Sequence, residues 1–149
     1  MSLSDYIEDG QTYQFTKYIN LIKTEEDKKL FDLFAYGVFD PKIKYQNEKQ
    51  KKKMIILTIL KLCQSNKCVT FDQIQQACCL NSRAEIEQLL IDLIQKDLII
   101  ATIDDQKGCL NIQRCISRDV HKSHIPAMKN QIESMYERVK HLKEQLKKQ

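Results

Sequence analysis

The residues of this sequence that could do chemistry are cysteines and histidines. The six cysteines are Cys63, Cys68, Cys78, Cys79, Cys109 and Cys115. No two of them form a CxxC pair, the spacing that structural zinc sites use. The three histidines are His121, His124 and His141. None stands in an HExxH motif or in the HxH…D arrangement of zinc isopeptidases, and no carboxylate completes a ligand set with the first two. We therefore predict no metal site and no cofactor.

Signatures of catalysis are also missing. The chain has no GxSxG elbow, no kinase motif set and, with three glycines, no Gly-rich phosphate loop. No cysteine neighbours a histidine in the sequence. We interpret the thiols as small buried apolar groups. The prediction is that the protein is not an enzyme and has no catalytic residues.

Length and composition favour a globular protein. The 149 residues fit one domain with an appended element, and the 42% hydrophobic and 30% charged residues are an ordinary balance. The longest apolar run, residues 54–60, is far shorter than the roughly 18 residues that a membrane helix needs. The N-terminus shows no secretory signal. We expect a location in the cytoplasm or the nucleus.

The front of the chain reads as two helices. Apolar residues at helical spacing predict the first over 11–23. Thr24 is an expected N-cap of the second, with acidic residues in its first turn and Gly37 as its end. Such a helical hairpin is too small to bury itself alone. It must pack against the segment that follows.

That segment, residues 54–63, is apolar on nearly every side of a helix. A helix of this kind is buried all round and therefore central. Lys49 and Lys51–Lys53 precede it. We interpret this basic run as the solvated start of the helix, although a nucleic-acid patch is the alternative.

The next part has the order of a winged helix. A short edge strand at Cys68 and Val69 precedes two helices, 71–78 and 83–96, with expected capping boxes at Thr70 and Ser82. A strand pair over 97–116 then turns at Asp104–Gly108. Its apolar wing residues are Ile99, Ala101, Ile103, Leu110 and Ile112. The predicted fold class is mainly α (α+β), a helical hairpin plus a winged helix with a small antiparallel sheet, followed by a long C-terminal helix.

A winged helix raises the possibility of DNA binding, but the charges oppose it. Residues 71–106, which hold the reading helix and most of the wing, contain two basic and seven acidic residues. Each phosphate contact needs a cation, and a negative surface repels the polyanion. We predict a module that docks proteins or pairs sheets. A homodimeric winged-helix repressor is the alternative.

The last helix carries a narrow apolar seam. Its residues recur at alternating steps of three and four: Ile125, Met128, Ile132, Met135, Val139, Leu142 and Leu146. This is the a/d pattern of a coiled coil. Ser123 is the expected cap, and Pro126 is tolerated in the first turn. The seam predicts entry into a bundle with other helices, with folding back onto its own domain as the alternative.

Three stretches resemble a known family. They are "LFAYGVFDPKI" at 33–43, "KQKKKMIILTILKLCQSNKCVTFDQI" at 49–74 and "CISRDV" at 115–120. In order and spacing they are similar to the PCI domain of subunit seven of the COP-nine signalosome, which shows an FAYG stretch and an RD motif after the second wing strand. Ser117 stands where that family has glycine. The proteasome lid and translation initiation factor three contain sister PCI proteins and remain alternatives.

The resemblance implies a scaffold subunit of a complex that removes a ubiquitin-like modifier from cullins, with the isopeptidase on another subunit. It divides the chain into a helical-repeat remnant (1–48), a winged helix (49–120) and a bundle helix (121–149). Its implied partners are other PCI subunits and, indirectly, cullin-RING ligases. By the same resemblance, Arg118 and Asp119 anchor the chain after the wing, and we expect an internal ion pair there.

Overall fold

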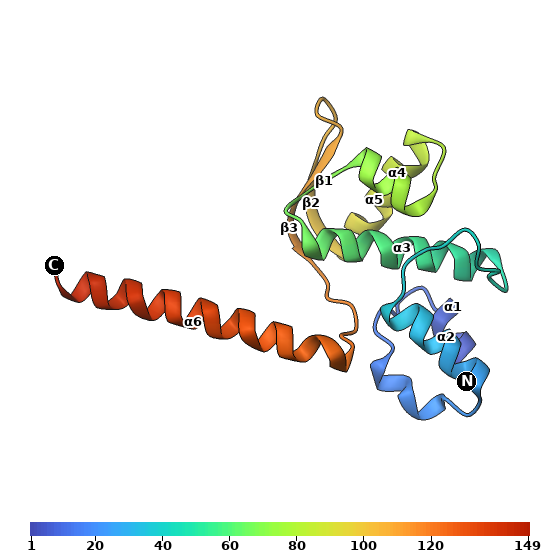
Figure 1. Ribbon diagram of the computed structural model, residues 1–149. Coiled ribbons are helices and arrows are strands. Elements are labelled where there is room, and N and C mark those ends of the chain that lie inside the picture. The colour runs from blue at the N-terminus through green and yellow to red at the C-terminus, as the bar shows by residue number, and fades with distance from the viewer. The chain divides into compact units, whose positions relative to one another are not determined.

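The computed structural model describes all residues, 1–149, and divides into two compact units, Met1–Asp119 and Val120–Gln149. The first unit contains helices α1 (Leu3–Glu8), α2 (Glu25–Tyr36), α3 (Glu48–Ser65), α4 (Phe71–Cys78) and α5 (Arg83–Gln95), the 3₁₀ turn η1 (Thr16–Leu21), and strands β1 (Cys68–Thr70), β2 (Ile99–Asp104) and β3 (Cys109–Cys115). The second contains the 3₁₀ turn η2 (Lys122–His124) and helix α6 (Ile125–Lys147). This confirms the predicted fold class (Figure 1). None of these helices is both long and apolar enough to cross a bilayer.

Helix α3 is the centre of the first unit, as its apolar pattern predicts. Every residue from Lys53 to Leu60 is buried, and Leu57 and Leu60 are fully enclosed. The helix contacts α1 on one side and α4, β1 and β3 on others. Figure 1 shows it running between the front helices and the winged-helix elements. Burial on all sides explains why this segment carries no polar stripe.

The lysines at the start of α3 divide into two kinds. Lys49, Lys51 and Lys52 are exposed, as a solvated helix start requires, whereas Lys53 is buried. Its Nζ donates to the carbonyl of Asp9 at 2.5 Å and lies 3.9 Å from the centre of the Tyr13 ring. Burial lowers the pKa of Lys53 to about 8. The interpretation of the run as solvated is therefore wrong for its last member.

The sheet has three antiparallel strands in the order β1-β3-β2. Leu110 is central, opposite Val69 on β1 and Ile103 on β2. A bulge between Ile100 and Ala101 shifts the register of β2. The turn between β2 and β3 uses Gly108 at φ +60, a conformation that glycine adopts without strain. Because β3 is central, only β1 and β2 have an edge without a neighbouring strand.

The predicted helix over 11–23 is wrong. Only the 3₁₀ turn Thr16–Leu21 forms there, while Phe15 is fully buried and begins that turn. The physical reason is tertiary: the Asp119 carboxylate accepts from the backbone N–H groups of Phe15 and Thr16 and fixes where the turn starts. Helix α1 was not predicted, although its reciprocal Ser2–Asp5 capping box was readable in the sequence.

The other predicted helix ends are partly correct. Thr24 and Gly37 bound α2 as expected, and the Thr70 capping box forms with Gln73. Ser82 is the N-cap of α5 but makes no side-chain capping bond. Ser123 does not cap α6, because it lies inside η2, where its N–H donates to the His121 ring. His124 is the N-cap residue of α6 instead.

Candidate functional site: protein-interaction surfaces

The RD motif lies against the FAYG motif, and the two form a single structural joint. Arg118 is 6% exposed, and its guanidinium donates to the carbonyls of Phe34, Ala35 and Gly37 at 2.9, 3.1 and 2.7 Å. The last carbonyls of a helix have no partners within the helix. Arg118 therefore closes the C-terminal end of α2. We call this contact the Arg118 clamp.

Gly37 gives the clamp its shape. A Cβ atom at this position would lie 2.5 Å from the carbonyl oxygen of Leu33, which is closer than a Cβ atom in a real protein approaches another heavy atom. The backbone N–H of Gly37 donates to the same oxygen at 2.9 Å and ends the helix. Glycine is thus required by the close approach of the chain to its own last turn. Its left-handed freedom is not involved, since φ is −73°.

Asp119 holds the neighbouring segment. Its carboxylate accepts from the N–H of Phe15, the N–H of Thr16 and the hydroxyl of Thr16. The internal ion pair expected for Arg118 and Asp119 is wrong, because no ion pair within 4.0 Å includes either residue. Burial lowers the pKa of Arg118, and the carbonyl oxygens supply its hydrogen-bond acceptors. Two successive residues therefore fasten the chain after β3 to α2 and η1.

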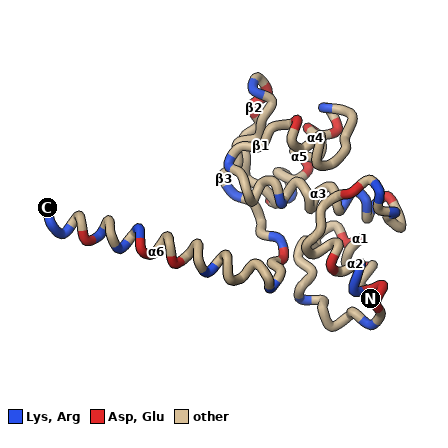
Figure 2. The backbone as a smooth tube through the Cα atoms, in the orientation of Figure 1, with Lys and Arg blue, Asp and Glu red and all other residues tan.

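The one arginine on α5 is occupied by carboxylates. Arg83 forms ion pairs with Glu87 at 2.9 Å and with Asp105 in the wing turn, and its guanidinium lies 5.0 Å from the centre of the Phe71 ring. Figure 2 shows acidic residues along α5. Arg83 is therefore already paired with two carboxylates and is not free to contact a DNA phosphate. The acidic excess predicted for residues 71–106 is therefore also present in how the charged side chains are arranged in space.

The predicted wing residues mostly face their own domain. Ile99 and Leu110 are fully buried, and Ala101, Ile103 and Ile112 are half-buried against the core. Leu110 and Ile112 also lie on the central strand, whose two edges are already paired. Only the main chain of β2 and its outward side chains remain available on this side of the sheet.

One outward side chain of β2 is large and apolar. Ile100 is 39% exposed and lies between the buried Ile99 and the half-buried Ala101. The register shift next to it arises from one extra residue on β3, Gln113, so β3 is the bulged strand. An edge strand with an exposed isoleucine can receive a strand from another chain. We call the main chain of β2 together with Ile100 the β2 edge.

Helix α6 has no buried residue at all. The predicted seam residues are exposed by between 43% at Met128 and 72% at Leu146. Val120, Ile125, Met128 and Ile132 line a shallow apolar groove of about 420 Å³ at its start. Isolated exposed apolar residues are ordinary, whereas a continuous line of seven is unusual on the surface of a monomeric protein. We call these seven residues the α6 seam.

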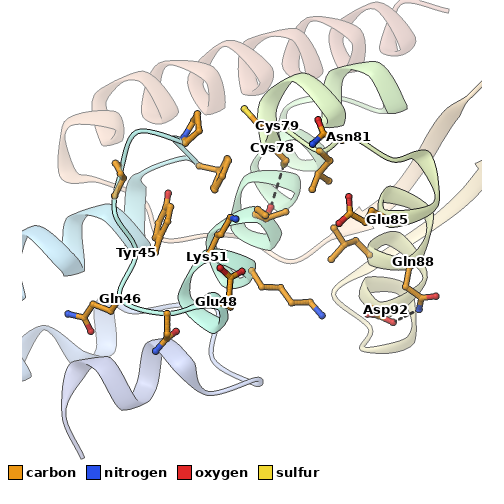
Figure 3. Close-up of a pocket in the computed structure, with 18 residues that line it drawn as sticks. Tyr45, Gln46, Glu48, Lys51, Cys78, Cys79, Asn81, Glu85, Gln88 and Asp92 are labelled. Carbon is orange, nitrogen blue, oxygen red and sulfur yellow. Dashed lines mark hydrogen bonds between the residues drawn. The ribbon is translucent and has the colours of Figure 1, made fainter.

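A groove that the sequence did not reveal lies between the α2–α3 connection, the start of α3 and the α4–α5 pair. It has a volume of about 920 Å³, and Figure 3 shows its lining side chains. Lys51 stands on its α3 wall, and Glu85 and Asp92 stand on α5. Cys78, at its base, is buried, and burial raises the pKa of that thiol to about 12. A protonated thiol is a poor nucleophile, so this cysteine offers the groove no covalent chemistry.

Four of the thiols lie in two pairs, because the side chains of Cys63 and Cys115 hydrogen-bond to each other, as do those of Cys68 and Cys109. Cys63, Cys78 and Cys109 are buried, as the interpretation of the thiols requires, but Cys68 and Cys79 are exposed. The rings of His121 and His124 lie 6.2 Å apart. No group of three potential metal ligands is brought together by the fold.

Comparison with known proteins places this geometry in a family. The PCI domain profile matches residues 21–114. The chain is 26% identical over 106 residues to COP9 signalosome complex subunit 7a of Pongo abelii and 24% identical over 106 residues to the protein of the same name of Mus musculus. Each alignment covers 67% of this chain and 38% of the relative. The chain therefore spans well under half the length of these curated relatives.

Proposed function

This chain belongs to the PCI domain family, and we propose that it is a non-catalytic scaffold subunit of the COP9 signalosome. The observation that carries the proposal is the α6 seam, seven apolar residues in solvent directly after a PCI domain. The similarity to subunit 7a of that complex supports this choice of assembly. Sister assemblies with PCI subunits, the proteasome lid and translation initiation factor three, are the alternatives that the experiment below separates.

The β2 edge is the first proposed contact. A strand that has only one neighbour presents unpaired main-chain groups, and pairing there depends little on side chains. We infer that the winged helix of another PCI subunit adds to this edge, with Ile100 covered by the incoming strand. The acidic surface of α5 is compatible with such a contact, because main-chain pairing needs no cations.

The α6 seam is the second proposed contact. A stripe confined to a and d positions is narrower than the face by which a helix packs on a broad core. Three heptads form only a marginal coiled coil alone, so we propose that the helix that pairs with the stripe belongs to a larger bundle. We propose that residues 121–149 enter a helical bundle of the complex, while residues 1–48 and 49–120 form the PCI domain proper. The Arg118 clamp connects those two parts.

The proposed role is structural and involves no cofactor. Substrate chemistry would belong to other subunits, and cullin-RING ligases would meet this chain only through the assembled complex. We propose that the protein works in the cytoplasm and the nucleus with that complex.

Affinity purification of the full chain from its source cell tests the proposal. We expect signalosome subunits to co-purify with the unchanged chain. The double variant Ile132→Asp/Val139→Asp should lose them, because it places carboxylates in the middle of the seam. Ser134→Asp/Lys140→Asp, on the opposite face of α6, should keep them. Recovery of proteasome-lid or initiation-factor subunits would assign a different complex, and equal recovery with both double variants would contradict the role of the seam.

DNA binding is the function that the geometry opposes. The isolated Arg83 is bound by Glu87 and Asp105, and no other arginine stands on α5. A titration of the full chain with duplex DNA at low salt should give no binding tighter than about 1 µM. Tight binding with a steep salt dependence would favour the homodimeric repressor.

A further inference from the structure

The flanks of the α6 seam carry charge of one sign only. With Ile125, Ile132, Val139 and Leu146 at position a, the flanking e and g positions are Lys129, Gln131, Tyr136, Arg138, Lys143 and Gln145. These six positions contain three cations and no carboxylate. The three glutamates of the helix, Glu133, Glu137 and Glu144, stand at the outer positions b and f. In coiled coils the e and g residues choose the partner and its orientation.

The chain itself leaves these cations available. Lys129 is 3.9 Å from Glu133, but both side chains are more than half exposed, and such a pair is weak. Arg138 and Lys143 form no ion pair within the chain. Helix α6 contains five basic and three acidic residues, so its net charge has the same sign as the flanks (Figure 2). The positive flanks therefore remain open to a partner.

A second copy of this chain does not satisfy the flanks. In a parallel pair, Arg138 would oppose Lys143 of the second copy. In an antiparallel pair, Arg138 would oppose Arg138, and Lys129 would oppose Lys143. Neither orientation offers an opposite-charge contact, and like charges at these positions destabilise the pair. Pairing with itself is thus the arrangement that this sequence disfavours.

We propose that the α6 seam selects a helix of a different chain whose own seam is flanked by aspartate or glutamate. This inference rests on the proposed function only in treating the seam as a pairing surface. The seven apolar residues supply the affinity, and the three cations supply the discrimination between partners. A single exposed charge pair is weak, so the selection of a partner needs all three cations together. Because salt screens exposed charges, the selection also depends on the ionic strength.

Two synthetic helices test this selection on the full chain. Both have the same Ile/Leu seam of four heptads; one has Glu at every e and g position and the other has Lys. In fluorescence anisotropy at low salt we expect the Glu helix to bind at least about tenfold more tightly. The difference should shrink in high salt, where the Debye length falls to about 3 Å. Equal binding of the two helices would overturn the proposal.

A charge-reversal variant makes the test independent of helix stability. Arg138→Glu/Lys143→Glu should invert the preference towards the Lys helix, an outcome that simple loss of folding cannot produce. Lys140→Gln/Lys147→Gln, at outer positions, should keep the preference for the Glu helix. A preference that does not respond to the reversal would refute the role of the flanks, as would a stable homodimer of the unchanged chain in sedimentation.

The two proposals fail in different ways. Co-purification of signalosome subunits without any charge preference refutes only the selection by the flanks. A clear charge preference without co-purification refutes only membership of the signalosome, because the synthetic helices measure the surface without reference to any complex.

Discussion

Helices α3 and α6 are the two longest of the chain and have opposite relations to solvent. Ten residues of α3 are buried, including three polar ones that hydrogen-bond within the domain, Gln50, Lys53 and Thr58. None of the residues of α6 is buried. The apolar residues of α3 surround its axis, whereas those of α6 follow one line. The comparison teaches that the apolar residues of α3 are packed by their own unit, whereas those of α6 have no packing partner within theirs; their packing against helices of other chains stays a proposal.

The largest expected effect is the contrast between matched leucine truncations in these helices. Leu57→Ala in α3 removes a fully buried side chain and should lower the free energy of unfolding by about 3 kcal/mol, through lost burial and a cavity. Leu142→Ala in α6, where the side chain is 57% exposed, should change it by less than about 0.5 kcal/mol. Urea unfolding followed by near-ultraviolet circular dichroism measures both. Similar losses for the two variants would mean that α6 packs within its own chain.

The Arg118 clamp should give the next largest effect. Arg118→Ala leaves three carbonyl oxygens at the end of α2 without their donor, and we expect a loss of about 2–3 kcal/mol. Arg114→Ala, an exposed position on β3, is the control and should change stability by less than about 0.5 kcal/mol. Urea unfolding of the two variants measures the free energy of unfolding that each substitution removes. A loss no larger than that of the control would show that water replaces the guanidinium without cost.

The smallest effect is expected at Gly37. Gly37→Ala forces a Cβ against the Leu33 carbonyl at 2.5 Å, and relieving that contact should cost about 1–2 kcal/mol. Gly10→Ala is a matched control, because no atom lies within 4 Å of the added Cβ. Thermal unfolding of the two alanine variants compares them directly. If they melt together, the end of α2 can move aside, and the clamp is looser than the distances indicate.

Much of the first unit was predictable because its signals are local. Apolar residues on nearly every side of α3 predicted that this helix is central. The N-cap Thr24 and the capping box at Thr70 predicted where α2 and α4 begin. The strand pair around Gly108 was readable from alternation and turn residues. The α6 seam was visible as a period in the sequence. Its proposed use in a bundle stays a prediction.

Three of the failures share one physical cause, which is contact between residues distant in sequence. Nothing near residue 15 announces that Asp119 will set the start of η1, so the periodic pattern over 11–23 suggested a regular helix. Lys53 belongs to the same lysine run as Lys52, yet its Nζ donates to the Asp9 carbonyl and lies over the Tyr13 ring, whereas Lys52 is exposed. The groove beside α3 and α5 has no sequence signature, since three separate segments form it.

The sequence by itself determined the order of elements from α2 onwards, the acidic character of residues 71–106 and the apolar line of α6, because periodicity and charge are properties of neighbours along the chain. Only the tertiary structure decided that Arg118 would meet three carbonyls 81 to 84 residues away and that β3 would be the central strand. Those outcomes depend on which unpaired polar groups the folded core brings within hydrogen-bond distance, and local sequence does not specify that distance.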